Sequence, residues 1–583
     1  MAYQLGESTI EVSESELRIS IPRSVWTKRG WEKLVLLLSS LVSSSLSWIS
    51  GPTETKSVLQ GSGEEGPRWK VLKLDGLSCL LYYLLIPVRH ELRKLYEAFD
   101  WAEIDAECGE VYKNQKLGAP AYAPQVLFRI VVLMYVSGTA FESRTLSRLS
   151  TDVSWRWFVG LSIWQGVPDA GTLSKFRQRL GVEKFETVLV KLIEACDAAG
   201  LVGHEEAYYD MTGVEASATQ ATPYQRAVIL AKALSAYLDQ EMGGVGQLTQ
   251  EQIAEIALDV LQAEHPSLKQ VSAAQVAASQ AKLAAKDAQN TQGEPKWWQR
   301  IQEQIADLGQ KTGDLPVAAK ARLSQVGQLL VPTLPQAWGN PDATVGHTRT
   351  DGTLCGYRSG FLVDAKRLII TAVVFTGLTQ REAPSLLTAL DTHYAILQRY
   401  PQRLGLDSAY EYDDIHLAMN AKSIAHVATV RSRPGAKGVF HSDAFLWNEE
   451  SQLRCPADHL MAHVGGPYKN NKERYQATVE CATCPLFNNC FTPEQQAKQG
   501  DNPQRVLQIE TAPHQRAQLH RVRSRSPEGR ALRYRRFAAE RLFGHNNHYH
   551  NGDKAPYRSG PMDHIAQLMV AFVSNLETLA TYA

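Results

Sequence analysis

The sequence predicts a mixed α/β fold, and three observations lead to this prediction. Residues 205–217 (EEAYYDMTGVEAS) alternate in side-chain character with a period of two, as a strand does. Residues 356–364 and 368–376 are two β patterns separated by three residues, which indicates a hairpin. Helical and strand patterns then alternate, with a helix at 382–398, a strand at 403–406, a helix at 413–422 and a strand at 425–430. This order describes a mixed sheet with helices on its faces.

Composition limits the class of protein. The chain of 583 residues is long enough for several domains, and its 61 basic and 61 acidic residues balance, so net charge does not by itself indicate a nucleic-acid-binding protein. Four of the eight cysteines are scattered among apolar neighbours and four are grouped, which is typical of a reducing compartment and one metal site. The apolar stretch 34–49 is interrupted by serines and is too short for a membrane span. We expect a soluble, cytoplasmic protein with no membrane partner.

The N-terminal third is expected to be mainly helical. Residues 1–70 hint at short strands near Ile10 and Leu17, then a helical run and a linker at 51–67, and we assign this region no function. Residues 71–201 follow a helical pattern, in which Pro124 is expected to begin a helix.

A short amphipathic helix is expected after the turn at 166–168, with Asp169 as its N-cap. It carries Lys175, Arg177 and Arg179, whose side chains suit phosphates and base edges, as in the recognition helix of a helix-turn-helix domain. The alternative is an ordinary basic surface helix.

Residues 224–338 are expected to form a helical insertion between segments of the sheet. They are rich in Ala, Gln, Leu and Lys, and apolar residues such as Ile253, Ile256 and Val260 recur at helical spacing. Few β-branched runs interrupt this pattern, so a helical subdomain is predicted.

The grouped cysteines predict a structural zinc site. Cys455, Cys481, Cys484 and Cys490 include one C-x-x-C pair, and four thiolates are a common ligand set for Zn²⁺. This region of the chain reads as poor in apolar residues, so a metal is expected to hold its shape. Four unrelated free thiols are the alternative.

The most basic segment lies near the C-terminus. Nine arginines occur with only two acids, Glu528 and Glu540, between residues 516 and 541: Arg516, Arg521, Arg523, Arg525, Arg530, Arg533, Arg535, Arg536 and Arg541. Duplex phosphates are the obvious polyanion to neutralise such a density of guanidinium groups. A helix is expected over residues 531–543, on which Glu540 either pairs with Arg536 at i,i+4 or serves as a metal-binding carboxylate.

Three acids occur in contexts that suit metal-assisted chemistry. Asp210 lies in the middle of the first strand, Asp407 ends the strand 403–406, and Glu540 lies on the late helix. Around a mixed sheet, such carboxylates can hold two divalent cations about 4 Å apart, and hard oxygen ligands suit Mg²⁺ or Mn²⁺. For Asp210 alone, a partly exposed acid on an edge strand remains the alternative.

The motifs resemble those of the DDE insertion-sequence transposases, in particular the insertion-sequence group numbered eleven eighty-two of superfamily four/five. The resemblance covers most of the chain from about residue 85 onward. The matching motifs are Pro120-Ala-Tyr122 with Pro124, Trp155-Arg-Trp157, Pro168-Asp-Ala170, Asp210-Met-Thr212, Gly356-Tyr357, Asp364-Ala365, Asp407-Ser-Ala-Tyr410, the cysteine cluster and Arg536-x-x-x-Glu540-x-x-Phe543-Gly544.

The resemblance implies a ribonuclease-H-like core in which Asp210, Asp407 and Glu540 form the catalytic triad and bind two Mg²⁺ (or Mn²⁺) ions. It further implies that Arg536 binds DNA. The family is also expected to contact DNA through side chains at two positions where this sequence departs from the family pattern. The family tyrosine position is Arg533, with Tyr534 one residue late, and the family lysine position is Asn547.

The expected domain organisation follows from these assignments. It comprises an N-terminal segment and linker (1–70), a helical DNA-binding domain (71–201), the first segment of the catalytic core (202–223), the helical insertion (224–338), the second core segment (339–437), the zinc module (438–500) and the third core segment with the basic region (501–583). By resemblance, the protein cuts the ends of its element and joins the 3′-hydroxyls to target DNA, working as a homodimer on double-stranded DNA at the bacterial nucleoid. A nuclease without strand transfer and a catalytically inactive DNA-binding protein derived from a transposase are the alternatives.

Overall fold

The computed structural model describes residues 2–5, 8–12, 17–20, 75–112, 121–139, 141–241, 248–288, 296–312, 319–340, 342–348, 352–430, 438–468, 470–498 and 503–582. It is a mixed α/β structure in two compact units. The first unit comprises residues 1–195, 549–551 and 568–583, and the second comprises residues 196–548 and 552–567. The expected helical run and the expected linker at 51–67 fall outside the described residues. None of the helices in the described ranges combines the length and the apolar character that a membrane crossing needs.

The first unit begins with a three-stranded antiparallel sheet. Its strands are β1 (Ala2–Leu5), β2 (Ser8–Val12) and β3 (Leu17–Ser20), paired in the order β1-β2-β3. The short strands expected near Ile10 and Leu17 are therefore confirmed as β2 and β3.

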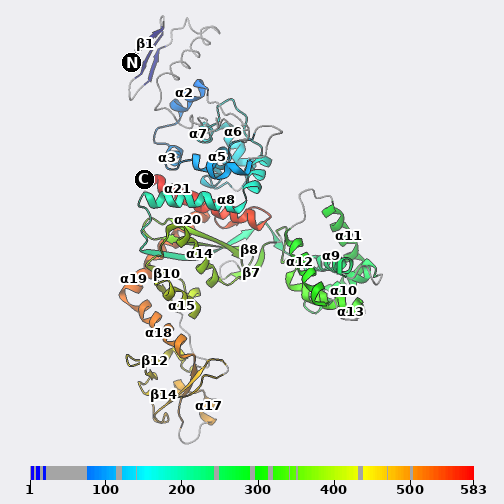
Figure 1. Ribbon diagram of the computed structural model, residues 1–583, viewed down its shortest axis with the longest axis vertical. Coiled ribbons are helices and arrows are strands. Elements are labelled where there is room, and N and C mark those ends of the chain that lie inside the picture. The colour runs from blue at the N-terminus through cyan, green and yellow to red at the C-terminus, as the bar shows by residue number, and fades with distance from the viewer. Residues whose placement is uncertain are drawn as a thin grey trace. The chain divides into compact units, whose positions relative to one another are not determined.

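The other described elements of the first unit are helical (Figure 1). They are α2 (Gly76–Leu85), α3 (Glu91–Glu97), α4 (Ala102–Cys108), η2 (Gly109–Tyr112), α5 (Pro124–Val136), α6 (Glu142–Thr151), α7 (Val153–Val159) and α8 (Ala170–Ala198). As expected, α5 begins at Pro124, where a missing N–H costs nothing because that group has no partner within the helix. The core surrounds α5, and Phe572 from the C-terminal helix packs edge-on against Phe128 at 5.1 Å.

Helix α8 has the expected start and an unexpected length. The Asp169 carboxylate accepts a hydrogen bond from the backbone N–H of Thr172 (2.7 Å), as an N-cap does. The basic stretch of α8 ends at a kink at Gly181, whose φ of 65° favours glycine, and the helix then continues to Ala198. The predicted short helix is thus the first of two helical pieces.

The second unit contains a mixed sheet of seven strands in the order β11-β10-β4-β8-β7, with β9 paired to β8 and β17 to β4. These strands are β4 (Glu206–Ala216), β7 (Thr344–Thr348), β8 (Gly352–Asp364), β9 (Ile370–Gly377), β10 (Arg403–Leu406), β11 (Ala425–Ala428) and β17 (Lys554–Ala555). β4, β10 and β11 run parallel, whereas β8 is antiparallel to β4 and to β9. The predicted hairpin and the predicted mixed sheet are both confirmed.

The two faces of β4 differ. α14 (Glu382–Leu397), η5 (Ser408–Tyr410) and α15 (Asp413–Ala421) contribute to an apolar core that also contains Ala207 and Tyr209. Because side chains alternate along a strand, Tyr208 and Asp210 face away from this core. Phe361, which lies opposite Asp210 on β8, stacks on Phe543 at 5.3 Å, so the later helix that carries Phe543 covers the Asp210 face.

The insertion is helical, as predicted, and has its own apolar core (green in Figure 1). Its elements are α9 (Pro223–Glu241), α10 (Gln250–Gln262), η3 (Pro266–Gln270), α11 (Ala273–Ala288), α12 (Lys296–Thr312), α13 (Ala319–Leu330) and η4 (Val331–Thr333). At its two ends, β5 (Thr219–Gln220) pairs with β6 (Ala337–Trp338). The insertion therefore leaves and rejoins the core at adjacent points.

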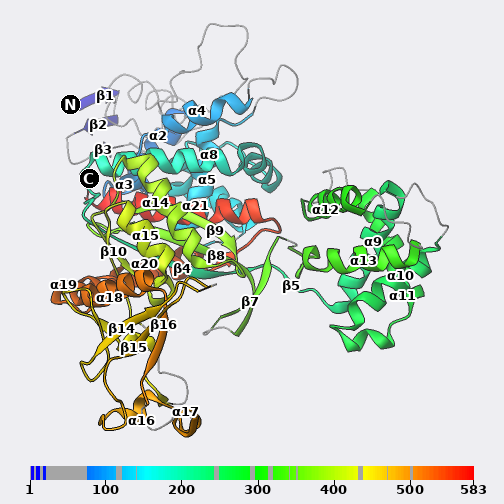
Figure 2. The same cartoon turned by 60° about the horizontal axis from the view of Figure 1, so that its bottom comes forward.

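The cysteine region folds around a five-stranded antiparallel sheet (Figure 2). Its elements are η7 (Ser442–Ala444), β12 (Leu446–Trp447), β13 (Leu453–Arg454), β14 (Leu460–Gly465), β15 (Glu473–Ala477), α16 (Phe487–Cys490), α17 (Pro493–Lys498) and β16 (Val506–Ile509). Phe445, Leu453, Met461 and Tyr475 belong to a buried cluster. Although apolar residues are few in this region, those present converge on one buried centre.

The remaining elements are α18 (Thr511–Arg525), α19 (Pro527–Arg535), α20 (Phe537–His550) and α21 (Gly560–Tyr582). The single helix predicted over 531–543 is wrong in one respect, since the structure has two helices that meet at Arg536. At this junction, consecutive arginines reach two different carboxylates of β4, which a straight helix surface would not allow.

Candidate active site

Three acids predicted from the sequence belong to neighbouring elements of the second unit. Asp210 lies in the middle of β4, Asp407 directly follows β10, and Glu540 lies in the first turn of α20. β10 pairs in parallel with β4 as far as Gly405 opposite Tyr208, and two residues further along the chain Asp407 lies near enough to Asp210 for its charge to raise the Asp210 pKa. The sheet alone therefore brings two of the three acids together.

The Asp210 carboxyl is in an unfavourable place for a charge. Burial raises its pKa to about 6, the Arg536 guanidinium opposes that rise, and the charge of Asp407 adds to it. The backbone N–H of Met211 donates to one carboxylate oxygen at 2.9 Å. These groups do not fully compensate the buried charge, so a cation at this position would be stabilised.

Asp407 is held by the backbone that follows it. Its side chain is the N-cap of η5 and accepts a hydrogen bond from the backbone N–H of Ala409. Because the strand ends at Leu406, the acid sits at the carboxyl end of β10, where α/β sheets place functional groups.

Arg536 forms ion pairs with Asp210 and Glu540. Its Nη1 donates to Asp210 at 2.8 Å, and its Nη2 donates to Glu540 at 2.6 Å. The pairing of Arg536 with Glu540 that the sequence allowed is present, and the same guanidinium also reaches the sheet. Among the described residues, the oxygen atoms of the three acids do not form a group within 4.8 Å of one another.

The chemical character of the site suits a divalent cation. Its candidate ligands are carboxylate oxygens, which Mg²⁺ and Mn²⁺ prefer, and two of them come from β4 and from the end of the adjacent strand β10. Arg536 pairs with Asp210 and Glu540, and displacement of its guanidinium would free their oxygens for a metal.

A second arginine contact beside the site was not predicted. Arg535 donates two hydrogen bonds to Glu206, from Nε at 2.8 Å and from Nη2 at 2.6 Å, and Tyr208 also donates to Glu206. Glu206 is 8 % exposed, and these hydrogen bonds and charges lower its pKa despite burial. The signal in the sequence was the Glu206, Tyr208, Asp210 alternation, which places Glu206 on the same face as Asp210.

The other residues predicted near Glu540 have varied surroundings. Arg533 is partly exposed on α19, and Asn547 is partly buried on α20. Tyr534 is 76 % exposed, and its ring lies 6.1 Å from that of Phe537, which is 52 % exposed. An exposed aromatic pair thus lies next to Arg536.

In the first unit, the three basic residues predicted on α8 do not share one environment. Lys175 and Arg179 are exposed, and the Arg179 guanidinium lies 4.6 Å from the centre of the Tyr112 ring. Arg177 is 2 % exposed and forms an ion pair with Glu142 of α6. As placed, Arg177 binds two helices together rather than facing solvent.

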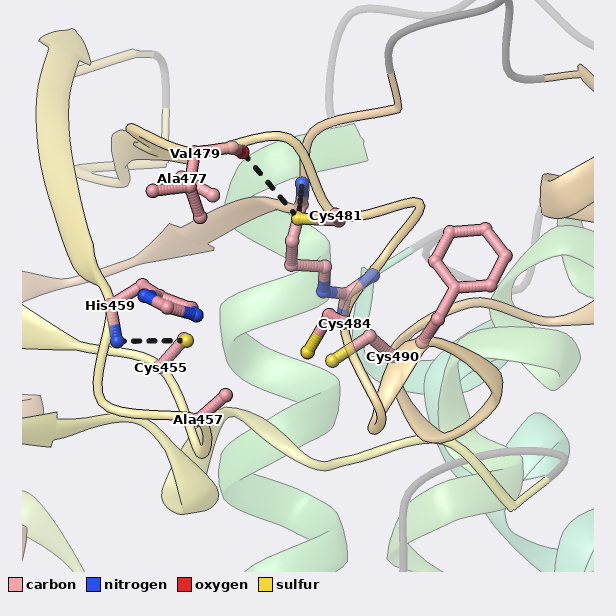
Figure 3. Close-up of a pocket in the computed structure, with 10 residues that line it drawn as sticks. Cys455, Ala457, His459, Ala477, Val479, Cys481, Cys484 and Cys490 are labelled. Atoms are coloured by element: carbon pink, nitrogen blue, oxygen red, sulfur yellow. Dashed lines mark hydrogen bonds between the residues drawn. The ribbon is translucent and has the colours of Figure 1, made fainter.

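The four grouped cysteines line one pocket in the β12–β16 region. Figure 3 shows Cys484 and Cys490 close together, with Cys455 across the pocket. Backbone N–H groups of His459 and Arg505 donate to the sulfurs of Cys455 and Cys481, both at 3.4 Å. No three of the sulfur atoms in the described chain come within 4.8 Å of one another, so they do not form a closed zinc site here.

Comparisons with known protein families give two matches, both to transposase domains. Residues 81–179 match the family described as Transposase domain (DUF772), and residues 454–580 match the family described as Transposase DDE domain. No curated protein and no solved structure matches the chain. The two family matches support an insertion-sequence DDE transposase, and the second indicates a nuclease or transposase enzyme.

Proposed function

We propose that this protein is a DDE transposase that cuts the ends of its insertion element and joins the released 3′-hydroxyls to target DNA. One observation carries the proposal: Asp210 lies on β4, Asp407 directly follows the adjacent parallel strand β10, and Arg536 links Asp210 to Glu540. The two transposase family matches support this interpretation of the geometry. The order of β4, the β8–β9 hairpin, α14, β10, α15 and β11 is consistent with a ribonuclease-H-like core.

Asp210, Asp407 and Glu540 would hold two divalent ions, Mg²⁺ or Mn²⁺. Bound there, such ions activate the attacking oxygen and stabilise the leaving oxygen in phosphodiester chemistry. In the first reaction, water breaks a phosphodiester bond at the element's end and leaves a 3′-hydroxyl. In the second, that hydroxyl attacks a target phosphodiester bond, and a target 3′-oxygen leaves.

Arg536 has a second task in this proposal. Its guanidinium neutralises Asp210 and Glu540 in the structure, and a metal on these acids would release it. A released guanidinium can hold a phosphate through two parallel hydrogen bonds and stabilise the charge that develops there. Arg533, Tyr534 and Asn547 lie on the same helices and would contact DNA beside the cut.

DNA binding is assigned to two regions. Lys175 and Arg179 are the exposed basic residues of α8 that would contact the terminal repeats, whereas Arg177 is kept out of this role by its buried ion pair. The exposed arginines of these helices, Arg523 and Arg525 on α18 and Arg530 on α19, would contact further phosphates. Pairing of two ends requires at least a homodimer in the working complex.

The cysteine pocket is proposed as a structural zinc site. Cys455, Cys481, Cys484 and Cys490 supply a thiol ligand set of the right kind, and the sulfurs would have to move together to close around an ion. Burial raises the pKa of Cys490 to about 11, so the thiol is protonated at neutral pH unless a cation favours the thiolate.

The test is cleavage of supercoiled DNA that carries the element's own ends, in the presence of Mg²⁺. We expect the wild type to cut at the ends, and Asp210→Asn, Asp407→Asn and Glu540→Gln each to lose at least about 100-fold in rate, as losses of a metal ligand do. Glu215→Gln is the matched control, since Glu215 lies on the same strand in an exposed ion pair with Lys554.

The outcomes separate the alternatives. Joined products show a transposase, whereas cut ends without joined products show a nuclease. Binding without cutting by the wild type would indicate an inactive DNA-binding protein, and equal cutting by wild type and Asp210→Asn would contradict the assigned site.

A further inference from the structure

Three histidines from three elements meet in the interior of the second unit, away from the carboxylates described above. His416 lies on α15, His426 on β11 and His520 on α18, and they are 3 %, 2 % and 3 % exposed. One ring nitrogen of each lies within 4.8 Å of a ring nitrogen of the other two. Histidines are seldom buried so completely as a group, because each imidazole has two polar nitrogens that need partners.

The hydrogen bonds within the cluster do not satisfy all of these nitrogens. Nδ1 of His416 and Nε2 of His426 are 2.7 Å apart, so one donates to the other. Nε2 of His520 accepts from the backbone N–H of Ala428 at 3.0 Å, and Nδ1 of His520 has no hydrogen-bond partner. A buried polar atom without a partner is unfavourable, so the cluster as it stands is incomplete.

The imidazoles are in the form that binds metals. Burial lowers the pKa of His426 to about 3 and that of His520 to about 2, and it also lowers the pKa of His416. All three rings are therefore neutral at physiological pH, and a neutral imidazole is the usual protein ligand for a transition metal.

The surrounding charges do not exclude a cation. The charged groups that act on the three rings are Glu411, Asp413, Arg516, Arg521 and Arg523. Arg516 is neutralised by two hydrogen bonds to Asp413, both 2.7 Å, and Arg521 pairs with Asp443 at 2.8 Å. The positive charges are thus largely paired with carboxylates.

We propose that His416, His426 and His520 form a second metal site, which takes a divalent transition-metal ion of the zinc class. Three neutral nitrogen donors suit Zn²⁺ better than Mg²⁺, which prefers oxygen. When Nδ1 of His520 holds the ion, its Nε2 carries the proton and can donate to Ser524 Oγ, which lies 3.3 Å away. The Ala428 N–H would then face an N–H group instead of an acceptor, so the His520 ring has to turn away from Ala428 when the ion binds.

The ion would fasten the basic helix α18 to the sheet. His520 comes from α18, whereas His426 lies on the strand β11 and His416 on the helix that precedes it. α18 leads through α19 to α20, which carries Glu540. A metal at the histidines would therefore stabilise the segment that connects the cysteine region to the candidate active site.

The experiment measures zinc in full-length protein without DNA, so its result does not depend on the proposed function. Wild type, His426→Gln and His416→Gln are stripped with a chelator, reloaded with Zn²⁺, desalted and analysed for metal by mass spectrometry. We expect each variant to hold about one equivalent less zinc than the wild type, because each loses one of three ligands. Equal zinc in the wild type and in a folded His426→Gln protein would overturn the proposal.

The matched control is His393→Gln. His393 is also fully buried, its pKa is also lowered, to about 4, and its Nδ1 is 2.8 Å from Thr371 Oγ1, but it lies outside the cluster. We expect this variant to retain the zinc content of the wild type. Loss of the same equivalent in this control would mean that any buried substitution releases zinc, and it would contradict the assignment.

X-ray absorption at the zinc edge of the reloaded wild type is a second measurement. It tests the proposal even where the variants fail to fold, because it needs only the wild type. We expect imidazole nitrogen scattering alongside any sulfur scattering from the cysteine pocket. Sulfur scattering alone, or no retained zinc, would show that the histidines bind no metal.

Discussion

Burial disfavours the ionised form of the Asp210 carboxyl group. Its pKa is raised to about 6, so the folded protein binds a proton more tightly than the unfolded chain does. The contribution of Asp210 to stability is therefore largest below the ordinary aspartate pKa, and it is lost as pH rises through about 6.

Asp210→Asn is accordingly expected to stabilise the metal-free protein at pH 7.5. The shift corresponds to roughly 1–2 kcal/mol after allowance for partial exposure of the side chain, and Arg536 keeps Glu540 as a partner. Urea unfolding in the presence of a chelator measures this effect. A loss of stability larger than about 1 kcal/mol would show that the Arg536 pair outweighs the cost of burial.

Arg536 is expected to be needed for cleavage more than for DNA binding. Arg536→Lys keeps the charge but cannot contact two acids or hold a phosphate with a planar fork. We expect cleavage to fall by about 10- to 100-fold, with the dissociation constant for DNA unchanged within about threefold. Arg530→Lys is the control, because Arg530 is exposed on α19 and bonds to a backbone carbonyl. Equal losses in cleavage and binding would make Arg536 a simple phosphate contact.

At the scale of elements, α19 packs on β10 and β11 just before the junction at Arg536. Leu532 is buried there, and Gly405 of β10 lies between it and the Tyr208 ring, which a Cβ atom on Gly405 would approach within 2.9 Å. The Arg535 pair with Glu206 then fixes the last turn of α19.

Glu206→Gln is expected to destabilise the protein by about 1–3 kcal/mol at pH 7, because a buried charge-assisted pair is lost while Arg535 can still turn to solvent. Since the pKa of Glu206 is lowered in the fold, its contribution is present above the ordinary glutamate pKa and disappears at lower pH. The loss in the variant should therefore shrink in acid. Urea unfolding at pH 7 and pH 4 tests this, with Glu215→Gln expected to change stability by less than about 0.5 kcal/mol. A loss that is the same at both pH values would contradict the charge argument.

The junction of α15, β11 and α18 is expected to be sensitive to acid in the metal-free protein. The pKa of His426 is lowered to about 3, so the unfolded chain binds more protons than the fold below pH 6.5, and stability falls as pH decreases from there. His426 alone corresponds to about 2 kcal/mol lost between pH 7 and pH 5. In His426→Gln the dependence on pH should be weaker by that amount, as measured by urea unfolding with chelator present. An unchanged slope would mean that the rings remain neutral for another reason.

At the scale of the whole molecule, only some arginines of the basic segment are available to DNA. Arg516, Arg521, Arg535 and Arg536 form ion pairs with acids of the fold. Arg523, Arg525 and Arg530 are exposed. The density of arginine along the chain therefore overstates the number of phosphate contacts.

Replacing Arg523, Arg525 and Arg530 together by Gln is expected to weaken DNA binding with little dependence on sequence. Each lost phosphate contact lowers the slope of log affinity against log salt by about one unit, so the slope should fall by roughly three. Titrations of labelled duplex from low to moderate salt measure this, with the exposed Arg399→Gln as control. An unchanged slope would place the DNA on another surface.

The sequence by itself determined the elements and two of the three acid positions. Local patterns predicted the start of α5 at Pro124, the β8–β9 hairpin, the strand 403–406 and the alternation along β4, because caps, turns and the period of a strand depend on nearby residues. The placement of Asp407 at a strand end followed from the same reasoning.

The tertiary structure alone decided which distant side chains meet. The break at Arg536, the Arg535–Glu206 contact, the burial of Arg177 and the apolar core of the cysteine region all depend on partners far away in the chain. The same holds for the histidine cluster, whose members come from a helix, a strand and a later helix with no common motif. Periodicity reports which face of an element is buried, but only packing brings two such faces together, and electrostatic partners are chosen at that step.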